Sequence, residues 1–169
     1  MKKLSTLCGL LLLTASVVAA HPHFRKTVSV KMGEQEVSVS YFTLPANMTH
    51  LEGVADGAFV APGQPALKVA ADLTGGAATI PAGTYLVGAI KKGDGWTMVL
   101  YPGKLERGEK PDLSKAIKLD SQFNKSSDTS EHLVVDIGPG WGKNAGKAVV
   151  LIGFGNLWLD GVISDQSVS

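Results

Sequence analysis

Hydrophobic and polar residues alternate with a period of two along much of the chain after Phe24. Residues 27–31 alternate, and beyond Gly33 residues 36–42 alternate again until Pro45. Such alternation places successive side chains on opposite faces of a β-strand. Two runs of this kind around a short turn with glycine predict a β-hairpin. Proline cannot donate to a strand ladder, so Pro45 predicts the end of the second strand.

Shorter alternating runs continue toward the C-terminal part of the chain. Residues 84–90 and 96–101 predict a second hairpin around the turn Gly93-Asp94-Gly95. Stretches rich in polar residues, glycine or proline separate the runs and predict loops. The remaining predicted strands are 67–73, 116–119, 133–137, 148–154 and 157–162, the last two meeting at Gly155-Asn156, and the predicted loops are 46–65, 104–113, 124–130 and 138–146.

The number and spacing of the strands define the expected fold class. About nine short strands with regular turn signals and no convincing helix are typical of an all-β sandwich or barrel. The 20 glycines and 8 prolines favour short strands joined by turns over long helices, and 169 residues suit one domain. We therefore expect a single-domain antiparallel β-sandwich with little or no helix.

The first twenty residues have the layout of a secretory signal peptide. Lys2 and Lys3 give a positive start, residues 4–18 form an apolar run, and small residues at 18–20 form a cleavage site. The apolar run is shorter than the ~20 residues of a membrane-spanning helix. We predict a signal peptide over 1–20, a mature domain over 21–169, a periplasmic or extracellular location, and no membrane anchor after cleavage.

Cys8 is the only cysteine of the chain, and it lies inside the predicted signal peptide. Cleavage after Ala20 would remove it. The mature protein would then have neither a disulfide nor a thiol nucleophile, although it is expected in an oxidising compartment. Its stability would have to come from the packing of its sheets.

The charge of the mature part is nearly balanced. Removal of Lys2 and Lys3 leaves 14 of the 16 basic residues against 15 acidic ones. A surface for nucleic acid or for an anionic membrane needs an excess of basic residues. The composition therefore argues against both. The partner, an unidentified small molecule, glycan or protein, is not specified by the charge.

No recognised catalytic motif occurs in the sequence, which lacks the Gly-x-Ser-x-Gly of serine hydrolases. The glycine-rich run 138–147 differs from a phosphate-binding loop. Trp141 stands where a glycine is required, and Ala148 stands where a Ser or Thr must follow the lysine. A catalytic triad is defined by its arrangement in space, so the lack of a motif leaves the question of enzyme activity open. Because no motif supports catalysis, a binding function is favoured.

Two histidines near the predicted mature N-terminus carry the most chemical content. After cleavage, His21 would offer its α-amine and its imidazole, a two-nitrogen chelate that suits Cu(II). A second histidine would complete the arrangement known as a histidine brace. A histidine also follows a cleavage site by chance, and termini commonly have no role. The candidate ligands are His50, His132 and His23, with Glu52, Asp128 or Glu131 as an added oxygen ligand.

Of the three tryptophans, Trp141 is the candidate for a binding surface. Trp96 and Trp158 lie in alternating segments, where full or partial packing into the core is expected. Trp141 lies in the glycine-rich connection. Loop tryptophans often pack inward, but an exposed Trp141 would indicate a binding edge. A cleft lined by Trp141 and the 46–65 loop, which contains Glu52, would favour a small molecule or a glycan as the ligand.

The run Ile-Pro-Ala-Gly-Thr-Tyr-Leu at residues 80–86, followed after a turn by residues 96–101, resembles a bacterial family called domain of unknown function 2911. The opening pair of predicted strands and the closing strands around Gly155 are also similar to it, so that the resemblance covers about residues 24–162. It implies an exported β-rich domain without an assigned activity, and it brings no catalytic residues. The chain departs from the family at 46–65, which replace a segment containing Trp-Arg.

Three functions therefore remain open at this point. The first is a non-catalytic binding module with an unknown ligand, the second a copper-binding protein that uses His21, and the third a structural or cell-surface interaction module. The distance between His21 and a second histidine separates the copper protein from the others. The surroundings of Trp141 separate a binding module from a purely structural one.

Overall fold

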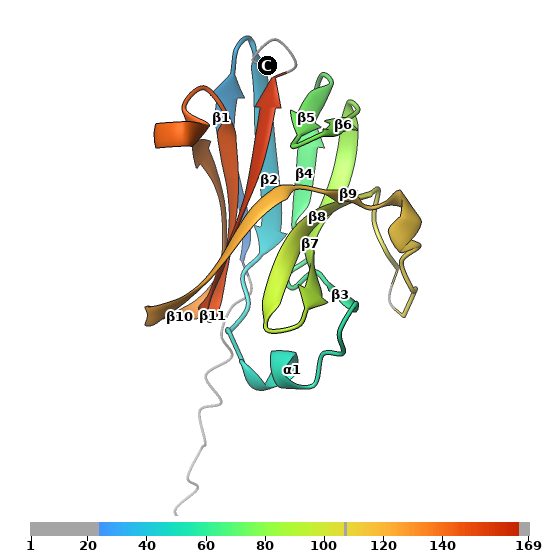
Figure 1. Ribbon diagram of the computed structural model, residues 1–169, viewed down its shortest axis with the longest axis vertical. Helices are drawn as coiled ribbons and strands as arrows, with labels where there is room; N and C mark the ends of the chain where they lie inside the picture. Colours follow the sequence, from blue (N-terminus) through green and yellow to red (C-terminus); the bar gives the residue numbers. More distant parts are fainter. Residues whose placement is uncertain (1–23, 107, 166–169) are drawn as a thin grey trace, which may run out of the picture.

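The computed structural model describes residues 24–106 and 108–165. The predicted signal peptide, His21 and His23 lie outside the described residues. The described chain forms two antiparallel β-sheets packed face to face, with little helix (Figure 1). The prediction of an all-β sandwich is therefore confirmed.

The larger sheet has seven strands and contains both predicted hairpins. Its strand order is β1-β2-β4-β7-β8-β9, and β3 pairs with β7 outside this path. The strands are β1 (Arg25–Met32), β2 (Gln35–Phe42), β3 (Phe59–Val60), β4 (Ala66–Val69), β7 (Gly83–Lys92), β8 (Gly95–Pro102) and β9 (Ile117–Lys118).

The smaller sheet has four strands in the order β10-β11-β5-β6. Two of them are much longer than the sequence pattern predicts. The strands are β5 (Leu73–Gly75), β6 (Ala78–Ile80), β10 (Asp120–Pro139) and β11 (Ala148–Asp165). The helical segments are the single turn α1 (Thr49–Glu52) and the 3-10 turns η1 (Leu113–Lys115) and η2 (Gly142–Asn144).

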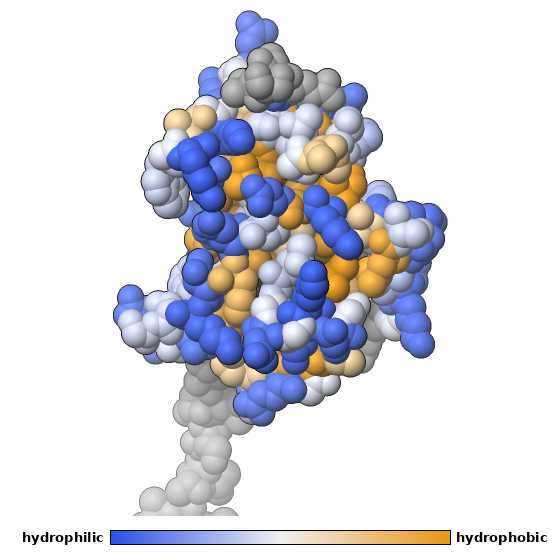
Figure 2. Space-filling view, in the orientation of Figure 1, coloured by the Kyte–Doolittle hydropathy of each residue, from blue (hydrophilic) through white to orange (hydrophobic). Residues whose placement is uncertain are grey.

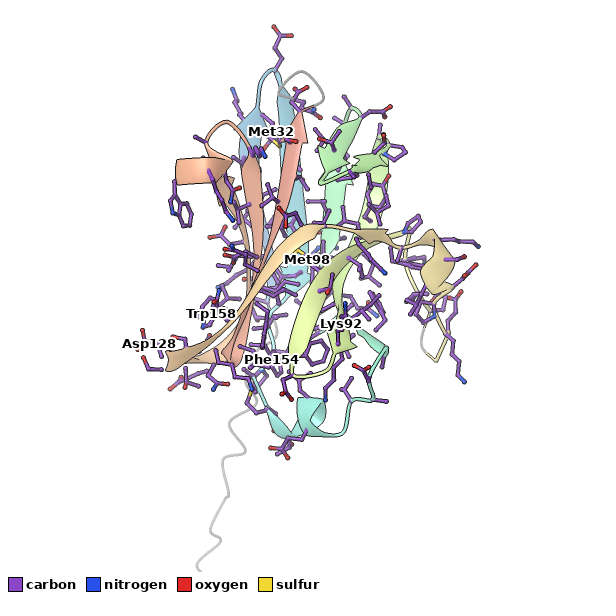
Figure 3. All side chains as sticks on the ribbon, viewed as in Figure 1. Met32, Lys92, Met98, Asp128, Phe154 and Trp158 are labelled. Carbon is purple, nitrogen blue, oxygen red and sulfur yellow. The ribbon has the colours of Figure 1, made fainter. Side chains whose placement is uncertain are left out.

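The core lies between the two sheets and is built from the inward positions of the alternating strands. Val37 and Val39 of β2 are fully buried, whereas their neighbours are partly exposed. Met98 lies in the middle of the sandwich, and Phe154 lies toward the end that α1 covers (Figure 3). Each such aliphatic or aromatic side chain contributes about 1.5–3 kcal/mol through burial.

β7 is buried on both faces, because a second apolar layer covers the outer side of its sheet. Residues 85–89 are all buried, without alternation. Phe59 of β3 lies over this outer face, with its ring centroid 6.2 Å from that of Tyr101. The region predicted as the 46–65 loop thus contains β3 and α1, and β3 seals the outer face of β7.

The prediction of one strand over 67–73 is wrong. Residues 66–69 form β4 in the larger sheet, and residues 73–75 form β5 in the smaller one. The chain crosses between the sheets at 70–72, where the Ala71 N–H donates to the Gln35 Oε1 atom. The same core contains Leu67 and Val69 of β4 and Leu73 of β5, which belong to opposite sheets. Because the apolar residues keep their period of two across the crossing, the sequence pattern does not reveal it.

The predictions of a loop at 124–130 and of a strand break at Gly155-Asn156 are also wrong. β10 and β11 form one long antiparallel ribbon, in which Lys125 pairs with Leu157 and Ser130 with Gly155. Its pairing shifts register on either side of Ser130, where β10 has extra residues. Such bulges bend a strand, and Gly155 has a φ of +60° at the same level. The polar residues at 124–130 lack apolar alternation because they lie near the exposed tip of the ribbon, where Figure 3 shows Asp128.

The bulged residues of β10 join the two sheets. The Leu133 N–H donates to the Leu44 carbonyl oxygen at 2.8 Å, and the Ala46 N–H donates to the Glu131 carbonyl oxygen at 2.9 Å. Pro45 and His132 form the bridge between them. The chain after β2 is thereby fixed to the ribbon at one end of the sandwich.

Candidate functional site

A polar cleft of about 220 Å³ lies on the smaller sheet, between the two halves of the bent ribbon and the loop that carries Trp141. β10, β11 and the 3-10 turn η2 all contribute to it. Its lining residues are Asp120, Gln122, Trp141, Gly142, Lys143, Asn144, Val149, Asp160 and Val162. We call it the Trp141 cleft.

The bend of β11 creates the Trp141 cleft. Val149 and Val162 line it together, although they are 13 residues apart on the same strand. In a straight strand they would be about 40 Å apart, at roughly 3.3 Å per residue. The ring of Trp158 likewise lies against Gly153, five residues before it. Figure 1 shows both strands of the ribbon running to a tip and then back.

The loop between β10 and β11 depends on its glycines. Gly142 has a φ of +58°, a conformation that residues with a side chain rarely adopt. A Cβ atom at Gly140 would collide with the backbone of Asn144. The Gly140 N–H donates to the Lys147 carbonyl oxygen at 2.8 Å, and the Asn144 N–H donates to that of Trp141 at 3.0 Å. This compact loop holds the Trp141 side chain 77% exposed.

The polar side chains of the Trp141 cleft have no partner within the described part of the chain. Gln122 and Asp160 face each other across the ribbon. Throughout residues 24–106 and 108–165, no hydrogen bond or ion pair joins the side chains of Asp120, Gln122, Lys143, Asn144 or Asp160 to another residue. Their donors and acceptors are therefore open to solvent or to a ligand.

Partial burial raises the pKa of the Asp160 carboxyl above its ordinary value of 3.8. Desolvation disfavours the charged form of a carboxylic acid. The carboxylate therefore costs folding free energy at pH values above its raised pKa. That cost disappears as the pH falls below the ordinary carboxyl range.

Asp160→Asn is therefore expected to be slightly more stable than the unmodified protein at pH 7. The gain should be no more than about 0.5 kcal/mol, as is usual for a partly exposed position. It should shrink toward zero as the pH is lowered through 4 to 3, because both proteins then carry a neutral side chain. Urea unfolding at pH 7 and pH 3.5 measures the difference. If the stability gain of Asp160→Asn instead increased as the pH was lowered, the pKa of Asp160 would not be raised in the folded protein.

Of the two residues predicted for ligand binding, only Trp141 lies in the cleft. Glu52 belongs to α1 and lines a different hollow, together with Lys91, Trp96 and Lys125 among others. The 46–65 segment is held at the turn of the β7–β8 hairpin, where the Gly93 N–H donates to the Asp56 carboxylate at 2.7 Å. The structure therefore does not bring Glu52 and Trp141 together.

The histidines lie apart from the Trp141 cleft. His50 is exposed on α1. His132 is exposed on β10 and lines a hollow of about 350 Å³ with Phe24, Lys26 and Thr43, among others. In the part of the chain that the structure describes, no three His, Cys, Asp or Glu side chains are close enough to hold a metal ion. The histidine brace predicted from the sequence would use His21, which lies outside the described residues.

Sequence reasoning missed most residues of the Trp141 cleft. Asp120, Gln122 and Asp160 come from two strands whose pairing the sequence does not display. One signal was present, because Asp120, Gln122 and Asn124 alternate with Ser121 and Phe123, which marks a polar strand face. Trp96 and Trp158, by contrast, are half-buried as expected.

Comparison with family models, with curated proteins and with solved structures found no match to this chain. The resemblance to domain of unknown function 2911 accordingly stays a prediction. Within the described residues, no helix is long and apolar enough to span a membrane. Figure 2 shows apolar surface in the middle of one face, with hydrophilic residues around it.

Proposed function

We propose that this protein is an exported, non-catalytic binding module that holds its ligand in the Trp141 cleft. The observation that carries the proposal is the exposed Trp141 indole beside several unpartnered polar side chains. Binding sites typically combine an apolar or aromatic surface with a few polar groups that fix the orientation of the ligand. Export is supported by the signal-peptide pattern of residues 1–20.

Trp141→Ala is expected to abolish ligand binding without destabilising the fold. Because the side chain is 77% exposed, its removal should change the unfolding free energy by less than about 0.5 kcal/mol. The test is a thermal-shift screen of the processed protein with cellohexaose, maltohexaose, spermidine, ATP and free amino acids. A ligand at 100 times its Kd stabilises the folded state by about 2.7 kcal/mol, which gives a clear rise in Tm.

Phe42→Ala is the matched control for this screen, since Phe42 is an aromatic side chain, 47% exposed, outside the cleft. A compound should raise the Tm of the unmodified protein and of Phe42→Ala, but not that of Trp141→Ala. If no compound raises the Tm, or if a compound raises the Tm of Trp141→Ala as much as that of the unmodified protein, the binding proposal fails. A structural or cell-surface interaction module is then the better interpretation.

Copper binding is the second candidate function, and one observation favours it. Phe24 and His132 line the same hollow, and the Phe24 N–H donates to the Thr43 Oγ1 atom at 2.9 Å. Three residues of extended chain span at most about 11 Å. A mature chain beginning at His21 would therefore start no more than about 11 Å from Phe24. We propose that its amine and imidazole, together with the His132 imidazole, supply three nitrogen ligands for Cu(II).

His132→Ala is expected to remove a one-to-one copper site, whereas His50→Ala should leave it intact. The sample must be exported and cleaved by its own signal, with the N-terminus confirmed by mass spectrometry. Titration with Cu(II) under electron paramagnetic resonance should show a nitrogen-rich tetragonal signal that disappears in His132→Ala and in His21→Ala. A signal that survives both changes, or weak binding without stoichiometry, would exclude the histidine brace.

A further inference from the structure

We infer that the ligand of the Trp141 cleft is a neutral saccharide, bound with one sugar ring against the indole of Trp141 and its hydroxyl groups on the ribbon. This inference rests on the proposed binding function and narrows it to one ligand class. Three features of the cleft support it: the exposed aromatic surface, the kinds of polar group beside it, and their charge.

The Trp141 indole offers a flat apolar surface next to water. Its side chain is 77% exposed, on a loop that its glycines and two backbone hydrogen bonds make compact. A pyranose ring is amphipathic in the same way, because its C–H groups form an apolar face while its hydroxyl groups point outward from the rim. Stacking would bury the apolar face and leave the hydroxyl groups to polar side chains.

The polar side chains beside Trp141 match hydroxyl groups. Asp120 and Asp160 offer carboxylate oxygens, which accept hydrogen bonds, and Gln122 and Asn144 offer amides, which both donate and accept. A hydroxyl group is itself a donor and an acceptor, so it can use all of these partners. Gln122 and Asp160 are directly opposed on neighbouring strands, which presents two such groups side by side, as neighbouring hydroxyl groups of a sugar require.

The charges of the cleft disfavour an anionic ligand. The carboxylates of Asp120 and Asp160 repel a phosphate or another anion, and the Lys143 ammonium offsets one of them, so that only a small net negative charge is left. The volume of about 220 Å³ is also below the roughly 300–1,000 Å³ of sites for drug-sized molecules. The cleft therefore suits the one ring that stacks on Trp141, and the other rings of a longer chain would extend beyond it.

The inference is tested by isothermal titration of the exported protein with cellohexaose, maltohexaose and xylohexaose, against spermidine and ATP. At least one oligosaccharide should bind, with a Kd raised at least tenfold in Trp141→Ala and partly restored in Trp141→Phe. Gln122→Ala should weaken binding by about 2- to 10-fold, the range for one lost hydrogen bond of 0.5–1.5 kcal/mol. Asn124→Ala, two residues along the same strand and outside the cleft, should bind as the unmodified protein does.

The possible outcomes separate the ligand class from the binding function. If spermidine or ATP binds and Trp141→Ala abolishes that binding, the saccharide inference fails while the binding function stands. If an oligosaccharide binds but Trp141→Ala and Gln122→Ala bind it equally well, the assignment of the site fails. If no probe binds, both fail. Mass spectrometry of the recovered saccharide should find it intact, whereas shorter products would support the ligand class and overturn the non-catalytic function.

Discussion

Leu100→Ala is expected to lower the free energy of unfolding by about 2–5 kcal/mol. Leu100 lies in the middle of β8, has no exposed surface, and belongs to the core between the sheets. Its truncation would remove buried methyl groups and leave a cavity, because close-packed interiors relax only in part. A domain with a typical stability of about 5–15 kcal/mol would lose a large share of it. Urea unfolding followed by tryptophan fluorescence and circular dichroism measures the change.

Leu100→Met is the control for this experiment. It keeps nearly the same volume in a flexible side chain, so it should cost less than about 1.5 kcal/mol. If the two variants were equally stable, Leu100 would not lie in a packed interior, and the arrangement of the two sheets would be wrong.

Gly88→Ala is expected to lower the free energy of unfolding by about 1–3 kcal/mol, the usual range for overpacking. A Cβ atom at Gly88 would collide with the ring of Phe59 and with the backbone carbonyl oxygen of Val60. Phe59 cannot move outward without losing its contact with Tyr101, and Val60 is held by its pairing with Ala89. The added methyl group should therefore detach β3 from the outer face of β7.

Gly138→Ala provides the matched control, because Gly138 also lies inside a strand but has open space where a Cβ atom would be. This change should be neutral or should stabilise the protein by up to about 0.5–1 kcal/mol, since glycine inside a strand is less favourable than alanine. Unfolding of both variants under identical conditions gives the comparison. A Gly88→Ala variant as stable as Gly138→Ala would show that Phe59 does not pack on Gly88.

The sequence alone was sufficient to predict the β1–β2 and β7–β8 hairpins of the larger sheet. The predicted strands at 27–31, 36–42, 84–90 and 96–101 all lie within β1, β2, β7 and β8. Alternation is a local property of a strand with one face in the core, and the turns at Gly33 and Gly93 both have positive φ values of about +60°, which glycine readily supplies. No knowledge of distant partners is needed to read such a hairpin.

The candidate site could be predicted only in part. Trp141 stood out because a large aromatic side chain in a glycine-rich connection has no strand to pack it. The remaining cleft residues are far apart in sequence, since about 40 residues separate Asp120 from Asp160. They meet only because β10 pairs with β11 and because both strands bend near Ser130 and Gly155. The pairing leaves no pattern in the residues of one strand alone, and the bend of β11 appears there only as the turn signal at Gly155-Asn156.

By itself, the sequence determined the all-β class, the two hairpins of the larger sheet and the glycine-rich loop that carries Trp141, because these follow from local periodicity and turn chemistry. The exposure of the Trp141 side chain was decided by the tertiary structure. Tertiary structure decided which strands belong to which sheet, as the crossing at 70–72 shows, and where Glu52 and Trp141 lie. It also decided that Gly155, which reads as a turn between two strands, is a bend within one strand. The physical reason is that backbone pairing and core packing are satisfied between distant segments, and the Trp141 cleft is a product of that long-range pairing.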